Sequence, residues 1–498
     1  MDVAVLGATG DVGRQVCAQL IERRVLPTTS RLQLVGRHGG ASGRATYGLR
    51  ADLVDAYDEH APLIDVALDP EDVVADVVVL TAGRTAPARA GASTDRAALA
   101  AGNLAVFESY ARAIARYGSG HEVVVVVSNP VELAVAVVAR ELGRHRVIGM
   151  GAWLDTLRFR RETAVSLGVR RHRVGGFVAG QHGDDLVPLW STVRISGLDV
   201  EERRRAVARL RGGRTLDGFG AEIEAAKQEL AVVGAHDAGR AFALVDTWPA
   251  DLRAVARPWL THQSGAKTAS ATAAATVDLV DTILDGRETV VAGQVDLAGE
   301  VSVAGRPVHG VLGVPVVLGP EGWTRVLLDE LPPDEERRLA AVAGRIGAAV
   351  AGWRAEAARA ATSTGPDGAG PAETGAAPDA TAPAAPAGTD PDPGAAAVAP
   401  GTMPAGVAAD ASDPDETPWT AHVVADHRTG TIAALSAVFA TRGVNFDALT
   451  TAYSAGDAGT VVIRFRADAR RCRALERAIA RLAVVRSVGV APAGDEPC

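Results

Sequence analysis

The chain has 498 residues, which is too long for a single hydrophobic core and predicts two or three domains. Its formal net charge of −9 gives no general attraction to nucleic acids or to acidic membranes, so we expect neither as a partner. The cysteines are far apart and have no metal-ligand spacing, which favours a reducing compartment and gives no reason to expect a disulfide framework or a metal site; they are Cys17, Cys472 and Cys498.

Residues 1–150 alternate short apolar runs with amphipathic segments. The runs "DVAVLGA", "LQLVG", "DVVVLTAG" and "VVVVVSN" are typical of buried parallel strands, and "VGRQVCAQLIERR" and "TDRAALAAGNLAVFESYARAIARY" of the helices between them. This alternation predicts an α/β fold with a doubly wound parallel sheet of the Rossmann type, forming a dinucleotide-binding domain over residues 1–150. No basic leader or cleavage site precedes the first strand, and no apolar run is long enough to span a membrane, so we expect a cytoplasmic protein.

The first turn of this domain carries glycines in the spacing G-x-x-G-x-x-G. Glycines after a first strand allow a tight turn and let backbone N–H groups reach a pyrophosphate at a helix N-terminus. Many tight turns carry such a triplet, but its place in a βαβ unit favours dinucleotide binding. The residues that we expect at the cofactor here are Gly7, Gly10, Asp11, Val12 and Gly13.

"VVVVVSNPVE" ends a predicted strand with Ser128 and Asn129. The carboxyl ends of strands line the ligand crevice in open α/β sheets, and an asparagine there offers both a donor and an acceptor. We expect both residues at the cofactor and Asn129 also at the substrate. The alternative is a simple turn after a strand.

Residues 151–354 form a mixed region with a helix, "LDTLRFRRETAVSLG", in which Asp155 and Arg158 share a face at positions i and i+3. These two residues are either a surface ion pair or a site in which Asp155 orients an imidazole and Arg158 grips a carboxylate. The motif "GQHGDDLVPLW" supplies an imidazole, His182, that glycines leave open to a small molecule. The alternative for His182 is a solvated turn residue, and Asp184 and Asp185 beside it need only be turn residues.

Residues 355–415 are rich in Ala, Pro, Gly, Thr and Asp and contain no aromatic residue, which predicts a disordered linker. Order returns over residues 416–495, where strand and helix patterns follow one another as βαββαβ. That order predicts a separate ferredoxin-like domain.

The glycine-rich N-terminus, "SNPVE", "LDTLRFR" and "GQHGDDLVPLW", in this order and spacing, resemble the lactate/malate dehydrogenase family over about residues 1–353. The resemblance implies that His182 exchanges the proton, that Asp155 orients it and that Arg158 clamps the substrate carboxylate. It also implies that Asn129 contacts substrate and nicotinamide, that Arg96 polarises the reacting carbonyl and that Thr268 lines the substrate pocket.

Further residues follow from the same resemblance. Arg96 precedes Asn103 by the family's seven residues, and we expect Asn103 near the cofactor. Arg89 is the nearest candidate for the second loop arginine with which malate-type members bind a distal carboxylate. With Arg89, Arg96 and Lys267 near the pocket, we expect a 2-ketoacid with a second anionic group. The stretch "AGRAFALVDTWPADLRAVARPWLTHQSG" looks inserted relative to the family.

Cofactor choice depends on the end of the second strand. NAD-specific relatives place an acidic residue there, but this chain has Gly36 followed by Arg37, and no Asp or Glu occurs from residue 31 to residue 51. We therefore expect Arg37 to bind a 2′-phosphate, with NADP(H) favoured and NAD(H) possible. In the alternative, Arg37 points into solvent and either cofactor serves.

The C-terminal region resembles an ACT domain, a small regulatory fold that often binds amino acids. "HRTGTIAALSAVFATRGVNFDALTT" carries the resemblance and implies an effector site at Gly430 and Asn445. A module that only dimerises is the alternative. Taken together, the patterns predict an NAD(P)-dependent 2-hydroxyacid dehydrogenase of malate or lactate type that forms a homodimer or homotetramer. Two other readings remain: a non-catalytic sensor of dinucleotide and amino acid, and a lactate-type enzyme for monocarboxylates.

Overall fold

The computed structural model describes residues 1–85, 96–363, 417–426, 430–440, 444–453, 458–480, 482 and 484–493. Arg89 and most of the predicted linker lie outside these described residues.

Six parallel strands form the N-terminal half of the large sheet, in the order β3-β2-β1-β4-β5-β6. They are β1 (Val3–Leu6), β2 (Arg31–Val35), β3 (Leu63–Ala67), β4 (Val77–Leu80), β5 (Val123–Val126) and β6 (Val147–Gly149). The helices among them are α1 (Asp11–Glu22), α2 (Gly40–Tyr57), α3 (Arg96–Tyr117) and α4 (Val131–Leu142). This order is that of a Rossmann fold, so the predicted parallel sheet is confirmed.

The sequence does not predict β3 or α2. β3 is an edge strand of the sheet with a partly exposed pattern, and α2 has only four buried residues along 18 positions. Because neither element carries a long apolar run, their hydrophobic signals are weak.

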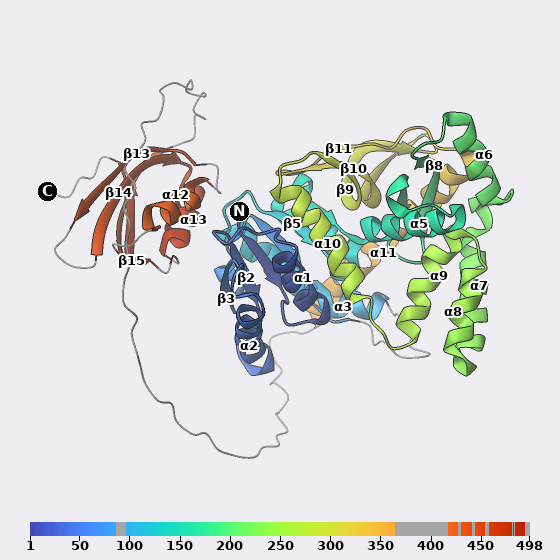
Figure 1. Cartoon of the computed structure of the whole chain (residues 1–498), viewed down its shortest axis with the longest axis horizontal. Coiled ribbons are helices and arrows are strands. Elements are labelled where there is room, and N and C mark those ends of the chain that lie inside the picture. The colour runs from blue at the N-terminus through green and yellow to red at the C-terminus, as the bar shows by residue number, and fades with distance from the viewer. Residues whose placement is uncertain are drawn as a thin grey trace, which may run out of the picture.

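The sheet continues past β6 through antiparallel strands, because β6 pairs with β9 (Thr289–Val303). The order then runs β9-β10-β7-β8, with β11 paired to β10. These strands are β10 (Arg306–Gly319), β7 (Val174–Gly180), β8 (Leu186–Ile195) and β11 (Gly322–Val326). Figure 1 shows β9, β10 and β11 above the helices α5 (Gly151–Leu167), α10 (Ala269–Leu284) and α11 (Pro333–Ser363).

The stretch that looks inserted in the sequence folds into two helices, α8 (Ala238–Asp246) and α9 (Ala250–Gln263). α9 packs against α5 and is held there by Arg253, whose Nε donates to Glu162 at 2.7 Å. Further helices on this side are α6 (Val200–Arg211) and α7 (Phe219–His236), and short 3₁₀ turns lie at η1 (Pro70–Asp72), η2 (Arg144–Arg146), η3 (Arg171–Arg173) and η4 (Leu216–Gly218).

Helix α11 continues to Ser363, nine residues past the boundary that the sequence predicts at residue 354. Arg354 donates from Nη2 to the carbonyl of Ala136 at 2.7 Å, and Trp353 packs against a buried cluster that includes α3 and α4 residues. The helix therefore has tertiary contacts at the point where composition alone suggested that the linker begins.

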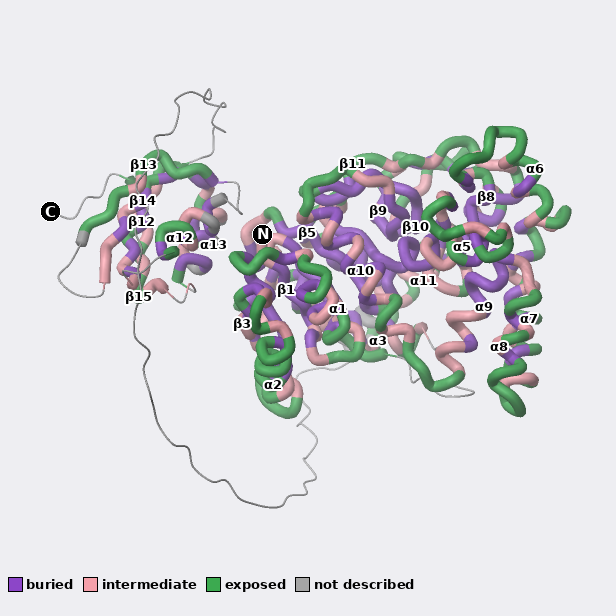
Figure 2. The backbone as a smooth tube through the Cα atoms, in the orientation of Figure 1, coloured by how far each residue is buried: buried purple, intermediate pink, exposed green. Residues whose placement is uncertain are grey.

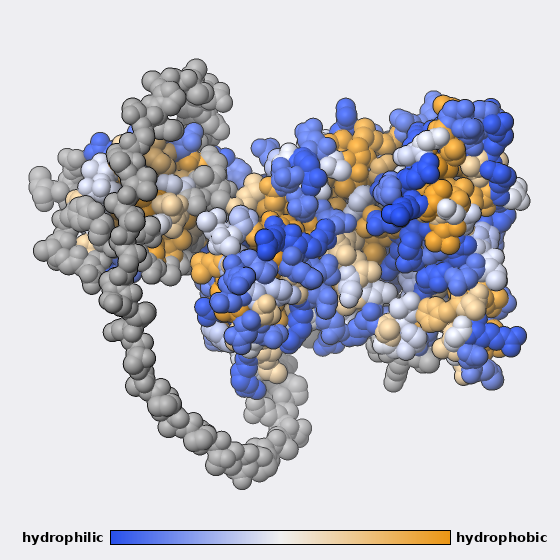
Figure 3. All heavy atoms as spheres, viewed as in Figure 1, coloured by the Kyte–Doolittle hydropathy of each residue, from blue (hydrophilic) through white to orange (hydrophobic). Residues whose placement is uncertain are grey.

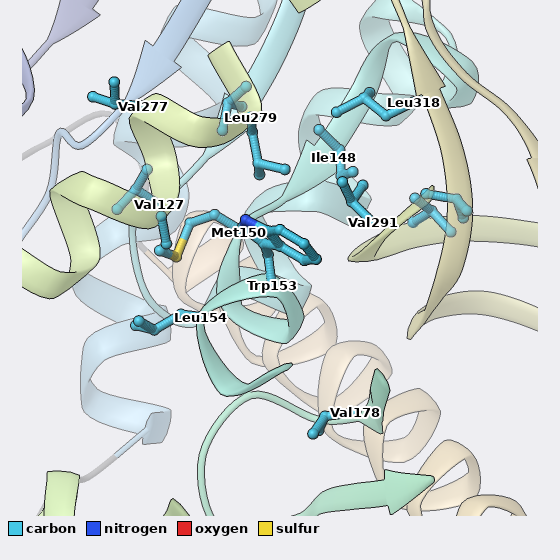
Figure 4. Close-up of a cluster of buried hydrophobic side chains, with 14 of the residues drawn as sticks. Val127, Ile148, Met150, Trp153, Leu154, Val178, Val277, Leu279, Val291 and Leu318 are labelled. Atoms are coloured by element: carbon cyan, nitrogen blue, oxygen red, sulfur yellow. The ribbon is translucent and has the colours of Figure 1, made fainter. Parts of the chain in front are cut away.

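The central parallel strands β1, β2, β4, β5 and β6 are buried at every position, and they lie within the purple interior of the large domain (Figure 2). At the start of α5, Met150, Trp153 and Leu154 lie among apolar side chains of the large core, including Val127 and Val178 (Figure 4). This packing fixes the first turns of α5, which carry the polar residues described below.

The C-terminal region forms a four-stranded antiparallel sheet in the order β13-β14-β12-β15. Its elements are β12 (Thr417–Asp426), α12 (Thr431–Ala440), β13 (Phe446–Tyr453), β14 (Ala458–Ala467), α13 (Ala469–Ala480) and β15 (Val485–Pro492). A separate buried cluster, with Phe439, Phe465 and Leu475, joins the helices to one face of the sheet. Figure 1 shows both helices on that face.

On the face seen in Figure 3, polar and apolar residues are interspersed over the large sheet and its helices. Among the described residues, no helix combines the length and apolarity that crossing a membrane requires.

Candidate active site

A cavity of about 320 Å³ opens at the carboxyl ends of the parallel strands. Thr81 follows β4, and Ser128 and Asn129 follow β5 on one side of it. α5, the turn after β7 and the start of α10 supply the other side, with Asp155, Arg158, His182 and Thr268. Six residues that the sequence predicts at the substrate or in catalysis thus meet in one cavity, although the first and the last are 172 positions apart in the chain (268 minus 96): Arg96, Asn129, Asp155, Arg158, His182 and Thr268.

His182 and Asp155 form a hydrogen-bonded pair in this cavity. Nδ1 of His182 lies 2.8 Å from Oδ2 of Asp155, and the backbone N–H of Gly183 donates to the same oxygen at 3.1 Å. The other oxygen of Asp155 accepts from Nη1 of Arg158 at 3.2 Å. A Cβ at Gly151 would come within 2.6 Å of the His182 side chain, so the glycine that begins α5 makes this close approach possible.

The electrostatics keep Asp155 ionised. Burial alone would raise the pKa of its carboxyl, but the attraction and hydrogen bond of His182, the charge of Arg158 and the Gly183 N–H outweigh burial, and the pKa is lowered. Burial lowers the pKa of the Arg158 guanidinium, and Asp155 opposes that effect. The pair thus places a fixed negative charge behind the imidazole and a desolvated cation beside it.

The turn that carries His182 is attached to two helices through the acids that follow it. Asp184 pairs with Nζ of Lys227 on α7 at 2.6 Å. Asp185 accepts from Nε and Nη2 of Arg345 on α11 at 2.9 and 2.8 Å, and from Arg338 at 3.3 Å. The expectation that these acids need only be turn residues is therefore wrong, because both make ion pairs with distant elements.

Arg96, the first residue of α3, reaches the same turn. Its Nη2 donates to the backbone carbonyl of His182 at 2.5 Å, and its Nη1 lies 3.7 Å from Oε2 of Glu132. Oε1 of Glu132 accepts the backbone N–H of His182 at 2.9 Å. Sequence reasoning quoted Glu132 in "SNPVE" but gave it no role, because an acid in the first turn of a helix is common.

The polar residues at the strand ends divide between the cavity and the backbone. Asn129 is exposed to the cavity. The hydroxyl of Ser128 donates to the carbonyls of Leu80 and Ala82 at 3.1 and 2.7 Å. Asn103, expected at the cofactor, is fully buried instead: its Nδ2 donates to the carbonyls of Arg84 and Asn129, and its Oδ1 accepts from the Arg84 N–H. Asn103 therefore fixes the backbone that presents Asn129.

The turn after β1 fits a dinucleotide pyrophosphate. Gly7 has φ +80° and lies against Ala82, and a Cβ at Gly13 would be 2.4 Å from the carbonyl oxygen of Gly7. Gly10 precedes α1, and Val12 lines the cavity. This turn leaves the N-terminus of α1 free of bulky side chains, as a pyrophosphate requires.

Asp11 and Lys267 form an ion pair beside this turn. Lys267 precedes α10 and lines the cavity, so its ammonium group is directed towards the N-terminus of α1. The sequence suggested that Lys267 serves the substrate, and the described contact is with the dinucleotide turn.

Arg37 lies at the carboxyl end of β2 and is exposed. Its backbone N–H donates to the hydroxyl of Ser42 at 3.3 Å. A Cβ at the preceding residue, Gly36, would lie 2.2 Å from Oγ1 of the fully buried Thr46, which occupies the space that an acidic side chain would need. The structure thus gives a steric reason for the missing acid at Gly36.

Sequence reasoning missed the part of the cavity that α9 supplies. Pro258, Trp259, His262 and Gln263, in the last turns of α9, line the cavity together with Lys267 and Thr268. The apparent insertion could have indicated this part of the cavity, because its residues Trp259 and His262 come shortly before Thr268, which the resemblance places at the substrate. Helical spacing alone could not show which face of α9 meets the cavity.

The two residues expected at an effector lie at turns of the C-terminal sheet. Gly430 has φ +92°, and among the described residues nothing lies within 4 Å of a Cβ built on it; its carbonyl accepts from the N–H of Ala434 in α12. Asn445 is exposed directly before β13. Within the described ranges, no group of three His, Cys, Asp or Glu residues could hold a metal ion.

Comparisons with known proteins show which family the chain is similar to. The family model described as "lactate/malate dehydrogenase, NAD binding domain" matches residues 1–149. A malate dehydrogenase of Bacillus thuringiensis is 30% identical over 344 residues, which cover 68% of this chain and 93% of that protein. A malate dehydrogenase of Methanothermobacter thermautotrophicus is 35% identical over 212 residues, 41% of this chain and 62% of that protein.

Two solved structures share the fold. The malate dehydrogenase of Cryptosporidium parvum superposes with a TM-score of 0.53 at 20% identity and covers 71% of this chain and 99% of its own. The lactate dehydrogenase of the same organism, solved with lactic acid and nicotinamide adenine dinucleotide, superposes with a TM-score of 0.54 at 21% identity and covers 71% of this chain and 98% of its own.

The fold and its relatives define a dehydrogenase that acts on a CH–OH group and carries an NAD-binding Rossmann domain. The chain belongs to the lactate/malate dehydrogenase family.

Proposed function

We propose that the protein is an NAD(P)-dependent 2-hydroxyacid dehydrogenase of the malate type, with residues 1–150 and 151–363 as its cofactor and substrate domains. The observation that carries the proposal is the chain of contacts from His182 through Asp155 to Arg158 inside one cavity. That arrangement offers a proton donor with a fixed counter-charge beside a carboxylate clamp.

The turn after β1, with Gly7, Gly10 and Gly13, would hold the nicotinamide dinucleotide, which when bound would supply a hydride for C2 of the ketoacid. Arg158 holds the substrate carboxylate, and negative charge develops on the C2 oxygen. Arg96 and protonated His182 stabilise that charge, and His182 delivers its proton to the oxygen. Since Nδ1 of His182 is engaged by Asp155, the proton leaves from Nε2.

A second anionic group on the substrate is supported by the charges around the cavity. Four arginine and lysine side chains line it, Arg84, Arg96, Arg158 and Lys267, against two acids, Asp155 and Asp184. Asp184 pairs with Lys227, and three of the four cations also have an acidic neighbour: Asp155 for Arg158, Glu132 for Arg96 and Asp11 for Lys267. An excess of positive charge favours a dianionic ketoacid such as oxaloacetate over a monocarboxylate. Arg89, a candidate for the distal group, lies outside the described residues.

The cofactor that we propose is NADP(H), with NAD(H) as the alternative. Arg37 is exposed at the end of β2, and Thr46 fills the position that an acid at Gly36 would take. A guanidinium there can form charge-assisted hydrogen bonds with a 2′-phosphate.

For the C-terminal region, we propose a ferredoxin-like, ACT-like regulatory domain with an amino-acid effector at Gly430 and Asn445. The β-α-β-β-α-β order and the strand order β13-β14-β12-β15 support the fold. Because the turn at Gly430 leaves open space, a small ligand can approach its backbone.

The test is a steady-state assay of NADPH and NADH oxidation with pyruvate, oxaloacetate, 2-oxoglutarate and a branched 2-ketoacid. We expect oxaloacetate with NADPH to give the highest kcat/KM. A preference for pyruvate refutes the substrate class, and a preference for NADH refutes the cofactor. A chain that binds dinucleotide but oxidises neither cofactor with any ketoacid is the sensor instead.

A further inference from the structure

Glu132 is a buried carboxylate that the proposed mechanism does not use. It belongs to the first turn of α4 and is fully buried. One oxygen accepts the backbone N–H of His182 at 2.9 Å, and the other lies 3.7 Å from Nη1 of Arg96. Within the described residues, Oε2 of Glu132 and Nη1 of Arg96 are both buried without a hydrogen-bond partner, and the 3.7 Å between them is an ion-pair distance.

Arg96 meets the His182 segment twice, once directly and once through this acid. Its Nη2 donates to the His182 carbonyl at 2.5 Å, while Nη1 faces the carboxylate that binds the His182 N–H. Glu132 and Arg96 thus hold both polar groups of one peptide residue. The three residues come from α4, from the start of α3 and from the turn after β7.

We propose that Glu132 is a positioning residue that fixes the Arg96 guanidinium relative to the His182 imidazole, so that both address one substrate oxygen. The inference rests on the proposed roles of Arg96 and His182 in ketoacid reduction. It goes beyond them because it assigns the geometry of the pair to a third residue that touches neither substrate nor cofactor.

The physical reason is that two donors aimed at one oxygen must be placed to within a fraction of an ångström. Arg96 is the first residue described in α3 and its side chain is 31% exposed, so the contacts at its guanidinium decide where its donors point. Glu132 is fully buried on α4, and its charge attracts Nη1 of Arg96 while Nη2 meets the His182 carbonyl. The guanidinium also lines the cavity and has further N–H donors for a substrate oxygen. The negative charge also offsets the repulsion between Arg96 and a protonated His182.

The experiment compares the wild-type chain with Glu132→Gln, Arg96→Gln and the double variant. Glutamine keeps the shape and an oxygen for the His182 N–H but removes the charge that faces Arg96. With the ketoacid and cofactor that the wild type prefers, we expect Glu132→Gln to lower kcat by about 10- to 100-fold, the range in which a misplaced catalytic group acts. The KM for ketoacid and the dissociation constant of NADPH should change less than about threefold.

Non-additivity separates positioning from general damage. We expect the double variant to have the same kcat as Arg96→Gln alone, because Glu132 has no further effect once the guanidinium is gone. Two controls on α4 are Glu141→Gln, which removes the charge of a half-buried acid paired with Arg140, and Val137→Ala, which disturbs the core. Both should keep kcat within about twofold, and Val137→Ala should lower Tm.

A kcat of Glu132→Gln within twofold of wild type overturns the inference, as does a double variant whose losses multiply. If Glu132→Gln does not fold, Glu132→Asp replaces it. The shorter side chain cannot reach both His182 and Arg96, so the same loss of kcat is expected, and a wild-type kcat overturns the inference. A wild-type chain that reduces no ketoacid overturns the proposed function and this inference with it, whereas an active wild type with an unaffected Glu132→Gln overturns only the inference.

Discussion

Replacing Asp155 by asparagine tests the centre of the proposed site. The carboxylate serves three donors at once: Nδ1 of His182, the Gly183 N–H and Nη1 of Arg158. An amide of the same shape cannot serve all three. If its oxygen faces His182, its NH₂ group opposes the guanidinium of Arg158, and if it is flipped, two N–H donors oppose Nδ1–H of His182 and force the other tautomer.

The magnitude follows from the distance and the burial. Asp155 is 1% exposed and 2.8 Å from the imidazole nitrogen. Two unit charges with centres about 4 Å apart interact by about 4 kcal/mol at an effective dielectric constant of about 20. Loss of that term from a transition state with a charged imidazole corresponds to about 10³-fold in rate. When the oxygen of the substituted amide faces His182, a neutral hydrogen bond to the imidazole remains, so we expect kcat to fall by about 10²- to 10³-fold.

The assay is steady-state ketoacid reduction at saturating cofactor, with NADPH binding measured separately by fluorescence titration. The dissociation constant of NADPH should stay within about twofold, because Asp155 lies away from the glycine turn. Asp246→Asn is the matched control, since it converts an exposed acid paired with Arg257 and should leave kcat unchanged. A folded Asp155→Asn enzyme with kcat within fivefold of wild type would refute the reasoning.

Four further outcomes are expected. His182→Asn should lower kcat by about 10²- to 10⁴-fold while NADPH still binds, and near-full turnover would remove His182 from the mechanism. Charge-assisted hydrogen bonds of about 1.5–3 kcal/mol from Arg37 should give the wild type a preference for NADPH of about 10- to 150-fold, and Arg37→Ala should erase most of that preference. The control Arg112→Ala, which breaks an exposed ion pair with Glu108, should keep it. Equal kcat/KM values of the wild type for NADPH and NADH would contradict this prediction. Truncation after Ser363 should leave a folded, active enzyme that no longer responds to an amino-acid effector, and an insoluble product would make the C-terminal region structural. Glu162→Gln should lower the free energy of unfolding by about 3–5 kcal/mol at pH 7, because Glu162 is buried between Arg253 and Arg257. Burial would raise the pKa of Glu162, but its arginine partners outweigh burial and lower that pKa, so the stabilisation is complete above the ordinary pKa of about 4.3 and is lost as the pH falls through the lower pKa of the folded state. In urea unfolding, the difference between variant and wild type should therefore shrink at that low pH.

The parallel sheet could be predicted because its strands are almost uninterrupted apolar runs. β4 and β5 read VVVL and VVVV and are buried at every position. A strand covered by helices on both faces needs such a run, and few other structures do. The edge strand β3 has mixed burial, so its sequence resembles many surface segments.

Asp155 and Arg158 could be placed together from helical spacing, because positions i and i+3 share a face in any helix. No such rule links Asp155 to His182, 27 positions later, or Arg96 to either. Those pairings came from a family resemblance, and the resemblance placed Asn103 at the cofactor where its amide instead binds the backbone of Arg84 and Asn129. A motif position identifies a residue, whereas its partners depend on the backbone that surrounds it.

The His182 turn shows why the remaining contacts were beyond sequence reasoning. Five helices hold this turn: α3 through Arg96, α4 through Glu132, α5 through Asp155, α7 through Lys227 on Asp184, and α11 through Arg345 on Asp185. Each partner is an ordinary charged residue on an amphipathic helix, and in sequence each is equally consistent with a solvated face. Their role is visible only when the fold brings them together at one turn. That turn needs such partners, because it has glycines on both sides of His182 and no secondary structure of its own to fix it. A flexible turn would lose rate through the entropy of placing the proton donor, so ion pairs from separate elements supply the rigidity that the glycines remove.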